Sequence, residues 1–232
     1  GPLFDAAGAA ADVAAMNALG VDFCRTAHYP NDVRTLRALE AAGILLAEEI
    51  PVYQWDGKQM ATPVLVERAD RALRRMIVRD VNRPAMAMWS IANEVWSFVP
   101  EAVPFFDRLA ATARALDPDR PVMAALLAAP VVSFSEADAA PEAVDVIGVN
   151  EYLGWYTGPV DDAGPYLDAA HARYPDKTLF LSEFGAGALR GRTLFGPPSQ
   201  EPVDEHSYTE EHQAWFLRQH LRQAAARGFV RG

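Results

Sequence analysis

Short apolar runs alternate along the chain with longer segments whose apolar positions recur at helical spacing. The short runs predict strands at residues 21–24, 44–49, 86–90, 121–127, 144–150 and 179–182. The longer segments predict helices at about residues 9–19, 31–42, 62–80, 101–116, 166–174 and 209–227. Strands that alternate with helices run parallel through helical crossovers, so the pattern predicts an α/β fold.

Among the apolar runs that end in acidic residues, two share one arrangement. Residues 84–94 contain an apolar run that closes on Asn93 and Glu94, and residues 177–185 repeat the arrangement around Glu183. Runs that are apolar on both faces are typical of buried parallel strands. In a barrel of such strands the carboxyl ends carry the chemistry, and a pair of carboxylates there is the working unit of a glycoside hydrolase.

A doubly wound sheet is the alternative arrangement of the same elements. It commonly binds nucleotides through a glycine-rich turn after a strand, and no predicted strand is followed by such a turn. We therefore favour a (β/α)8 TIM-barrel type of α/β fold, present as a partial barrel of about six strands. No internal repeat or linker divides it, so residues 1–232 are expected to form one domain with no second domain.

Composition narrows the range of partners. The net charge of −10 argues against nucleic acid or an anionic membrane as a partner, since both favour lysine and arginine. The single cysteine, Cys24, permits no internal disulfide, and no Cys/His cluster has metal-ligand spacing, so neither metal nor cofactor is expected. The first residues lack a basic segment followed by an apolar one, which leaves the location open and favours the cytoplasm.

Four motifs in order resemble one enzyme family. They are Arg25-Thr-Ala-His28-Tyr29-Pro30, Trp89-Ser-Ile-Ala-Asn93-Glu94, Asn150-Glu-Tyr152-Leu-Gly154-Trp155-Tyr156 and Ser182-Glu183-Phe184-Gly185. Together they resemble the catalytic (β/α)8 domain of family-2 glycoside hydrolases. The third motif and the Asp117-Pro-Asp-Arg-Pro turn are most similar to the β-glucuronidases of that family.

The resemblance implies a retaining β-glycosidase that hydrolyses terminal β-glycosides, with β-glucuronides as the best candidates. Glu94 would be the general acid/base and Glu183 the nucleophile that forms a covalent glycosyl-enzyme. An arginine near Glu183 would favour its ionised form. The residues implied to bind or neighbour the sugar are Asn93, Arg25, His28, Asn150, Tyr152 and Tyr156.

The resemblance also implies that the chain is a fragment of a larger enzyme. The predicted strands match the second to the seventh of the barrel, so the first and eighth would lie outside residues 1–232. The full-length protein could be an oligomer. The alternatives that stay open are a β-galactosidase or β-mannosidase of the same family, and a catalytically inactive carbohydrate-binding or structural fragment.

Several of these residues also have a purely structural interpretation. Arg25 could pair with Glu48 or Glu49 in a structural network. The loop aromatics Trp96, Tyr152, Trp155 and Tyr156 are expected at the rim of a cleft, whereas Trp215 and Phe216 are expected to pack in the last helix. The series Arg68, Arg71, Arg74 and Arg75 is expected to be a solvated helix face.

Overall fold

The computed structural model describes residues 5–127, 139–193 and 208–231. Its strands form one parallel sheet in sequence order. They are β1 (Phe23–Thr26), β2 (Leu45–Glu49), β3 (Met86–Asn93), β4 (Val122–Leu127), β5 (Val146–Asn150) and β6 (Thr178–Glu183). The helices are α1 (Ala6–Ala18), α2 (Val33–Ala41), α3 (Gly57–Ala61), α4 (Pro63–Asp80), α5 (Ala102–Leu116), α6 (Ala163–Arg173) and α7 (Glu210–Ala225), with 3-10 turns η1 (Ala140–Ala143) and η2 (Val160–Asp162).

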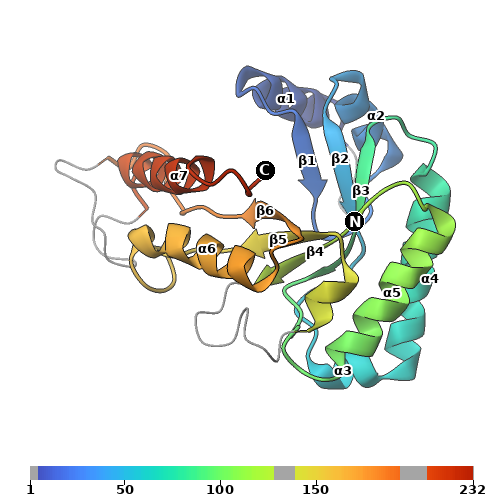
Figure 1. Cartoon of the computed structure of the whole chain (residues 1–232). Coiled ribbons are helices and arrows are strands. Elements are labelled where there is room, and N and C mark those ends of the chain that lie inside the picture. Colours follow the sequence, from blue (N-terminus) through green and yellow to red (C-terminus); the bar gives the residue numbers. More distant parts are fainter. Residues whose placement is uncertain (1–4, 128–138, 194–207, 232) are drawn as a thin grey trace.

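The sheet curls so that its edge strands approach each other across the concave side, while the helices lie on the outside (Figure 1). Phe23 of β1 and Phe180 of β6 meet there, with ring centroids 5.2 Å apart. Between them, Met88 and Met123 fill the concave side as part of a small apolar cluster. The expected partial (β/α)8 barrel is confirmed, as a curled half-barrel of six parallel strands.

The large apolar core lies between the convex side of the sheet and the helices. Leu73 and Met76 of α4 and Phe105 and Phe106 of α5 point inward and are buried. The opposite face of α4 carries exposed arginines, which confirms the expected solvated face. Phe216 of α7 is buried as expected, with Trp215 packed partly beside it.

The structure differs from the sequence-based expectation at several element boundaries. β3 runs to Asn93, beyond residue 90, because Asn93 pairs with Ala125 of β4. Helix α3, which was not expected, begins at a capping box in which the side chains of Asp56 and Gln59 each accept a hydrogen bond from the backbone N–H of the other residue. The polar stretch after β4 and the loop with Pro197 and Pro198 lie outside the described residues.

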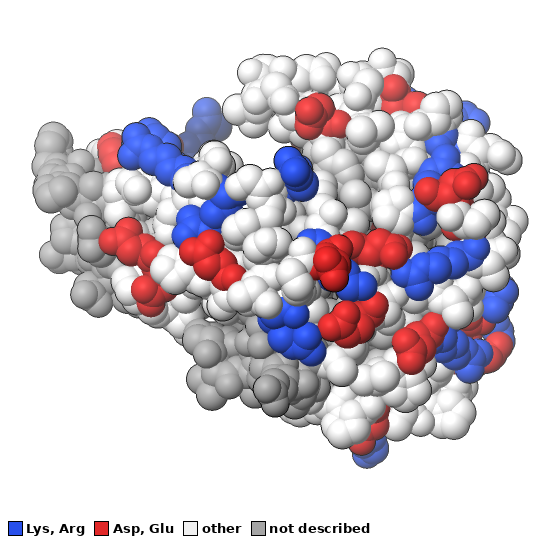
Figure 2. All heavy atoms as spheres, viewed as in Figure 1, with Lys and Arg blue, Asp and Glu red and all other residues white. Residues whose placement is uncertain are grey.

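Acidic and basic side chains are interspersed over the face shown in Figure 2, without a large area of one sign. Within the described ranges, no helix combines the length and the apolar character needed to cross a membrane.

Candidate active site

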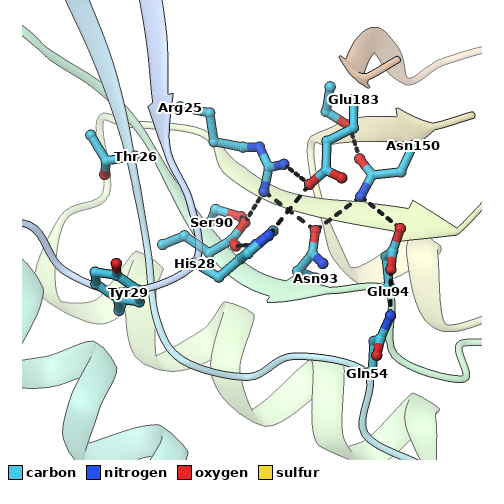
Figure 3. A network of polar contacts seen from close by, with 12 residues as sticks. Arg25, Thr26, His28, Tyr29, Gln54, Ser90, Asn93, Glu94, Asn150 and Glu183 are labelled. Carbon is cyan, nitrogen blue, oxygen red and sulfur yellow. Dashed lines mark hydrogen bonds and ion pairs between the residues drawn. The ribbon is translucent and has the colours of Figure 1, made fainter. Parts of the chain in front are cut away.

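Polar side chains gather where the strands of the sheet end. Arg25 lies in β1, Glu49 ends β2, Asn93 ends β3, Asn150 ends β5 and Glu183 ends β6. Parallel strands place their carboxyl ends at one edge, so residues far apart in the sequence become neighbours there. Figure 3 shows the side chains of Arg25, Asn93, Asn150 and Glu183 converging in one network.

Glu183 is held by groups on both of its carboxylate oxygens. The Arg25 guanidinium forms an ion pair with Oε1, and the Tyr152 hydroxyl donates to Oε2 over 2.8 Å. His28 Nε2 lies 3.8 Å from Oε1. The Glu183 side chain keeps 20% of its surface exposed, so the carboxylate remains accessible to solvent although three side chains surround it.

Tyr152 acts as a hydrogen-bond donor to Glu183. Burial and the adjacent Glu183 carboxylate raise the pKa of the Tyr152 phenol above its ordinary value. The hydroxyl therefore keeps its proton at neutral pH, and that proton is directed at Glu183 Oε2.

Glu94 follows β3 in a left-handed conformation, with φ of 49°. Its backbone N–H donates to the carbonyl of Ala125 over 2.8 Å, which keeps the residue aligned with β4. The carboxyl is largely buried and accepts an amide N–H on each oxygen. Gln54 Nε2 lies 2.9 Å from Oε2, and Asn150 Nδ2 lies 3.3 Å from Oε1.

A chain of amides fixes the orientation of Asn93. Ser182 Oγ donates to Asn150 Oδ1 over 2.6 Å, which turns the Asn150 Nδ2 toward Asn93 Oδ1 at 3.0 Å. Arg25 also donates to Asn93 Oδ1, over 3.4 Å. The Asn93 Nδ2 is buried and has no partner among the described residues. Asn93 thus presents an unpaired donor, and buried donors normally have a partner.

Glu49, at the end of β2, contacts three side chains of the network. Its buried carboxylate accepts from Arg25 over 2.7 Å and from Ser90 Oγ over 2.7 Å, and lies 2.9 Å from His28 Nδ1. Arg25 therefore pairs with Glu49, as the structural interpretation expects, and also with Glu183.

Glu48 points to the convex side of the sheet, where Arg79 donates to it over 2.9 Å and the Asn31 N–H over 3.0 Å. Burial, together with the neighbouring Asp80 carboxylate, raises the pKa of Glu48 to about 8. The expected alternative of an Arg25–Glu48 pair is thus wrong, because adjacent strand residues face opposite sides of the sheet.

The loop aromatics divide into two groups. Trp96 and Tyr156 are exposed, at 49% and 68%, and the Tyr156 ring packs 5.2 Å from the Tyr152 ring. Trp155, expected at the rim, is instead buried against Phe216 of α7 in a small apolar cluster. The loop turns just before Trp155 at Gly154, where φ is 87°.

A cavity of about 550 Å³ opens between the edge strands and is lined by Arg25, His28, Tyr152 and Glu183. A larger cavity of about 730 Å³ lies between α1 and α2, but neither Glu94 nor Glu183 lines it. The polar network therefore locates the site better than cavity size does. The described part of the chain contains no group of three or more His, Cys, Asp or Glu side chains that could hold a metal ion.

Sequence reasoning missed Gln54, Ser90 and Ser182 as parts of this network. Ser90 and Ser182 could have been found, since each faces the concave side near the end of a strand that was expected. Gln54 gave no such signal, because its position depends on the path of the loop after β2.

The fold and the site together define a glycoside hydrolase type of barrel, and comparison with known proteins identifies the family. The profile described as "Glycosyl hydrolases family 2, TIM barrel domain" matches residues 1–228. The chain belongs to that family.

Among curated relatives, the β-glucuronidase of Paenibacillus borealis is 33% identical over 210 residues, which is 83% of this chain and 33% of that protein. The β-glucuronidase of Sus scrofa is 32% identical over 208 residues, or 87% of this chain and 30% of that protein. The chain thus spans about a third of the length of these relatives.

Solved structures show the same similarity. The β-D-glucuronidase of Dictyoglomus thermophilum superimposes with a TM-score of 0.85 at 28% identity, covering 98% of this chain and 39% of that one. A β-galacturonidase from Eisenbergiella tayi gives a TM-score of 0.83 at 26% identity, with the same coverage of 98% and 39%.

Proposed function

We propose that residues 1–232 are the catalytic barrel portion of a retaining β-glycosidase, with β-glucuronides as the preferred substrates. Glu183 is the nucleophile and Glu94 the general acid/base. The observation that carries the proposal is the polar network at the strand ends, which joins both glutamates through Arg25, Asn93 and Asn150.

The contacts of Glu183 suit a nucleophile. Attack on the anomeric carbon requires an ionised carboxylate, and Arg25 and Tyr152 stabilise that form from two sides. The bond from Glu183 to the sugar forms as the bond to the leaving group breaks. Water later cleaves the glycosyl-enzyme.

We assign the proton transfers to Glu94, whose carboxyl is held by the side-chain amides of Gln54 and Asn150. Its proton goes to the glycosidic oxygen in the first step, and it takes a proton from water in the second. The unpaired Asn93 Nδ2 supplies a donor for a sugar hydroxyl, and the 2-hydroxyl is the contact that strengthens in the transition state.

The choice of sugar rests on the relatives, several of which are β-glucuronidases, and on the exposed Tyr156 beside Tyr152. A panel of aryl β-glucuronide, β-galacturonide, β-galactoside and β-mannoside would decide it. Faster hydrolysis of a neutral sugar than of both uronides would contradict the proposed specificity. The galacturonide is included because a β-galacturonidase superimposes on this chain.

The test of the nucleophile uses the full-length protein that contains this chain. A 2-deoxy-2-fluoro glycoside with an activated leaving group should label Glu183, and Glu183→Gln should abolish both labelling and turnover. Glu101→Gln, the same change at an exposed acid, is the matched control and should leave both unchanged. A label on any other residue would refute the assignment.

β1 and β6 are the edge strands of the described sheet, and β6 is paired on its outer side only by a single bridge from Leu179 to Val230. We expect the 232-residue chain alone to show negligible hydrolysis while still containing the network. Binding of sugar to the chain alone, combined with an inactive full-length protein, would instead support the alternative of a non-catalytic carbohydrate-binding domain.

A further inference from the structure

The loop that follows β2 crosses to the end of β3 and pairs with it. Asn93 donates its N–H to the carbonyl of Val52 over 2.8 Å, and the Gln54 N–H donates to the carbonyl of Asn93 over 2.9 Å. This backbone pairing continues the β2–β3 ladder past the end of β2 and places Gln54 directly beside Glu94.

Gln54 and Glu94 share an uncommon backbone conformation. Among described residues other than glycine, positive φ occurs at Gln54 (54°), Glu94 (49°) and Tyr208 (65°). Two of these three residues are joined by a side-chain hydrogen bond, from Gln54 Nε2 to Glu94 Oε2 over 2.9 Å. Backbone conformations of this kind cost free energy, persist where surrounding structure enforces them, and concentrate at functional sites.

We propose that Gln54 is a positioning residue that orients the Glu94 carboxyl and stabilises it as it loses its proton. The proposal rests on the acid/base role assigned to Glu94 above. It adds a residue from the loop after β2 to the site, and the fold alone does not require a glutamine there.

The proton balance of the first step explains why an amide suits this position. The Glu94 O–H bond breaks, the proton moves to the glycosidic oxygen, and the electron pair of the breaking sugar–oxygen bond passes to the leaving group. Negative charge then develops on Glu94. A hydrogen bond to a charged acceptor is stronger than one to a neutral acceptor, so the Gln54 N–H···Oε2 contact strengthens as the proton leaves.

The two amides on Glu94 also restrict where its proton can lie. Gln54 occupies one site on Oε2 and Asn150 one site on Oε1. A carboxyl group has about four lone-pair sites, so the proton is confined to the remaining ones. Without Gln54 the carboxyl could rotate, and fewer molecules would direct the proton at the leaving group.

The decisive experiment compares leaving groups in the full-length protein. Gln54→Leu keeps the size of the side chain and removes the donor. We expect kcat/KM for an unactivated phenyl glycoside to fall about tenfold, the lower range for one hydrogen bond to a charged group. For a dinitrophenyl glycoside, whose departure needs little protonation, we expect a fall of less than about twofold.

Gln54→Gly separates positioning from folding. Glycine adopts positive φ without steric cost, so this variant should melt at the wild-type temperature or above it, yet show the same leaving-group dependence. Lys58→Leu, an exposed change four residues further along the chain, is the control and should affect both substrates equally little.

The outcomes distinguish this proposal from the acid/base assignment itself. Glu94→Ala should show a much larger loss on the phenyl than on the dinitrophenyl glycoside. If it does not, the assignment of Glu94 fails. If Glu94→Ala shows that difference while Gln54→Leu and Gln54→Gly behave like Lys58→Leu, or lose equally on both substrates, the positioning role of Gln54 is refuted.

Discussion

Replacing Arg25 by methionine should destabilise the fold more than any other single change at the site. The Arg25 side chain is only 8% exposed and contacts two carboxylates, Glu49 and Glu183, whose side chains are 0% and 20% exposed. Methionine keeps the length of the aliphatic stem but removes the cation. Two carboxylates would then share a poorly solvated site without the arginine between them.

The magnitude follows from what each carboxylate retains. Glu49 keeps the hydroxyl of Ser90 and the ring of His28, and Glu183 keeps the hydroxyl of Tyr152. Breaking one side of a buried ion pair costs about 3–5 kcal/mol. Because these donors remain, we expect the lower value, a loss of about 3 kcal/mol in the free energy of unfolding.

Urea-induced unfolding of the wild type and of Arg25→Met measures this loss. Arg34→Met, which removes an exposed arginine paired with Asp32, is the control and should change stability far less. A double-mutant cycle with Glu49→Gln should give a coupling energy of about 0.5–3 kcal/mol. A loss below about 1 kcal/mol for Arg25→Met, or strict additivity with Glu49→Gln, would refute the reasoning.

Three further changes test other parts of the structure. Tyr152→Phe removes the donor to Glu183, so kcat/KM in the full-length protein should fall about 10–100-fold, as for one hydrogen bond to a charged group; an unchanged value would contradict the contact. The folded-state pKa of Glu48 is raised to about 8, so stability should fall as the pH rises from about 5 through 8. In Glu48→Gln, the free energy of unfolding measured in urea should depend less on pH over this range. The same pH dependence in the variant and the wild type would contradict the prediction. Gly148→Ala would place a Cβ 2.6 Å from Ser182 Oγ. Unfolding in urea should therefore show that the free energy of unfolding falls by about 1–3 kcal/mol, and an unchanged value would contradict the prediction.

The strand pattern predicted the polar edge of the sheet well because it depends on local sequence. An apolar run that ends in Asn93-Glu94, and another that ends at Glu183, place polar groups at strand ends whatever the loops do. Parallel pairing then brings those ends together, as the contacts of Arg25 with Asn93 and Glu183 show.

Other features depended on backbone geometry that no local pattern encodes. Trp155 lies in a loop rich in aromatic residues, yet it is buried in an apolar cluster with Phe216 of α7. Gln54 reaches Glu94 only because its loop pairs with Asn93. The orientation of Asn93 is set by Ser182 acting through Asn150, over two hydrogen bonds between three strands.

The contacts between the edge strands also decide between the two folds that the sequence allowed. In a flat doubly wound sheet with this strand order, β1 and β6 would be separated by five interstrand spacings, or about 24 Å. Phe23 instead packs on Phe180, and Arg25 pairs with Glu183. The curl that the apolar pair stabilises is therefore what brings the arginine to the glutamate. A substitution that opens the curl would remove the counter-charge of Glu183 without touching either residue.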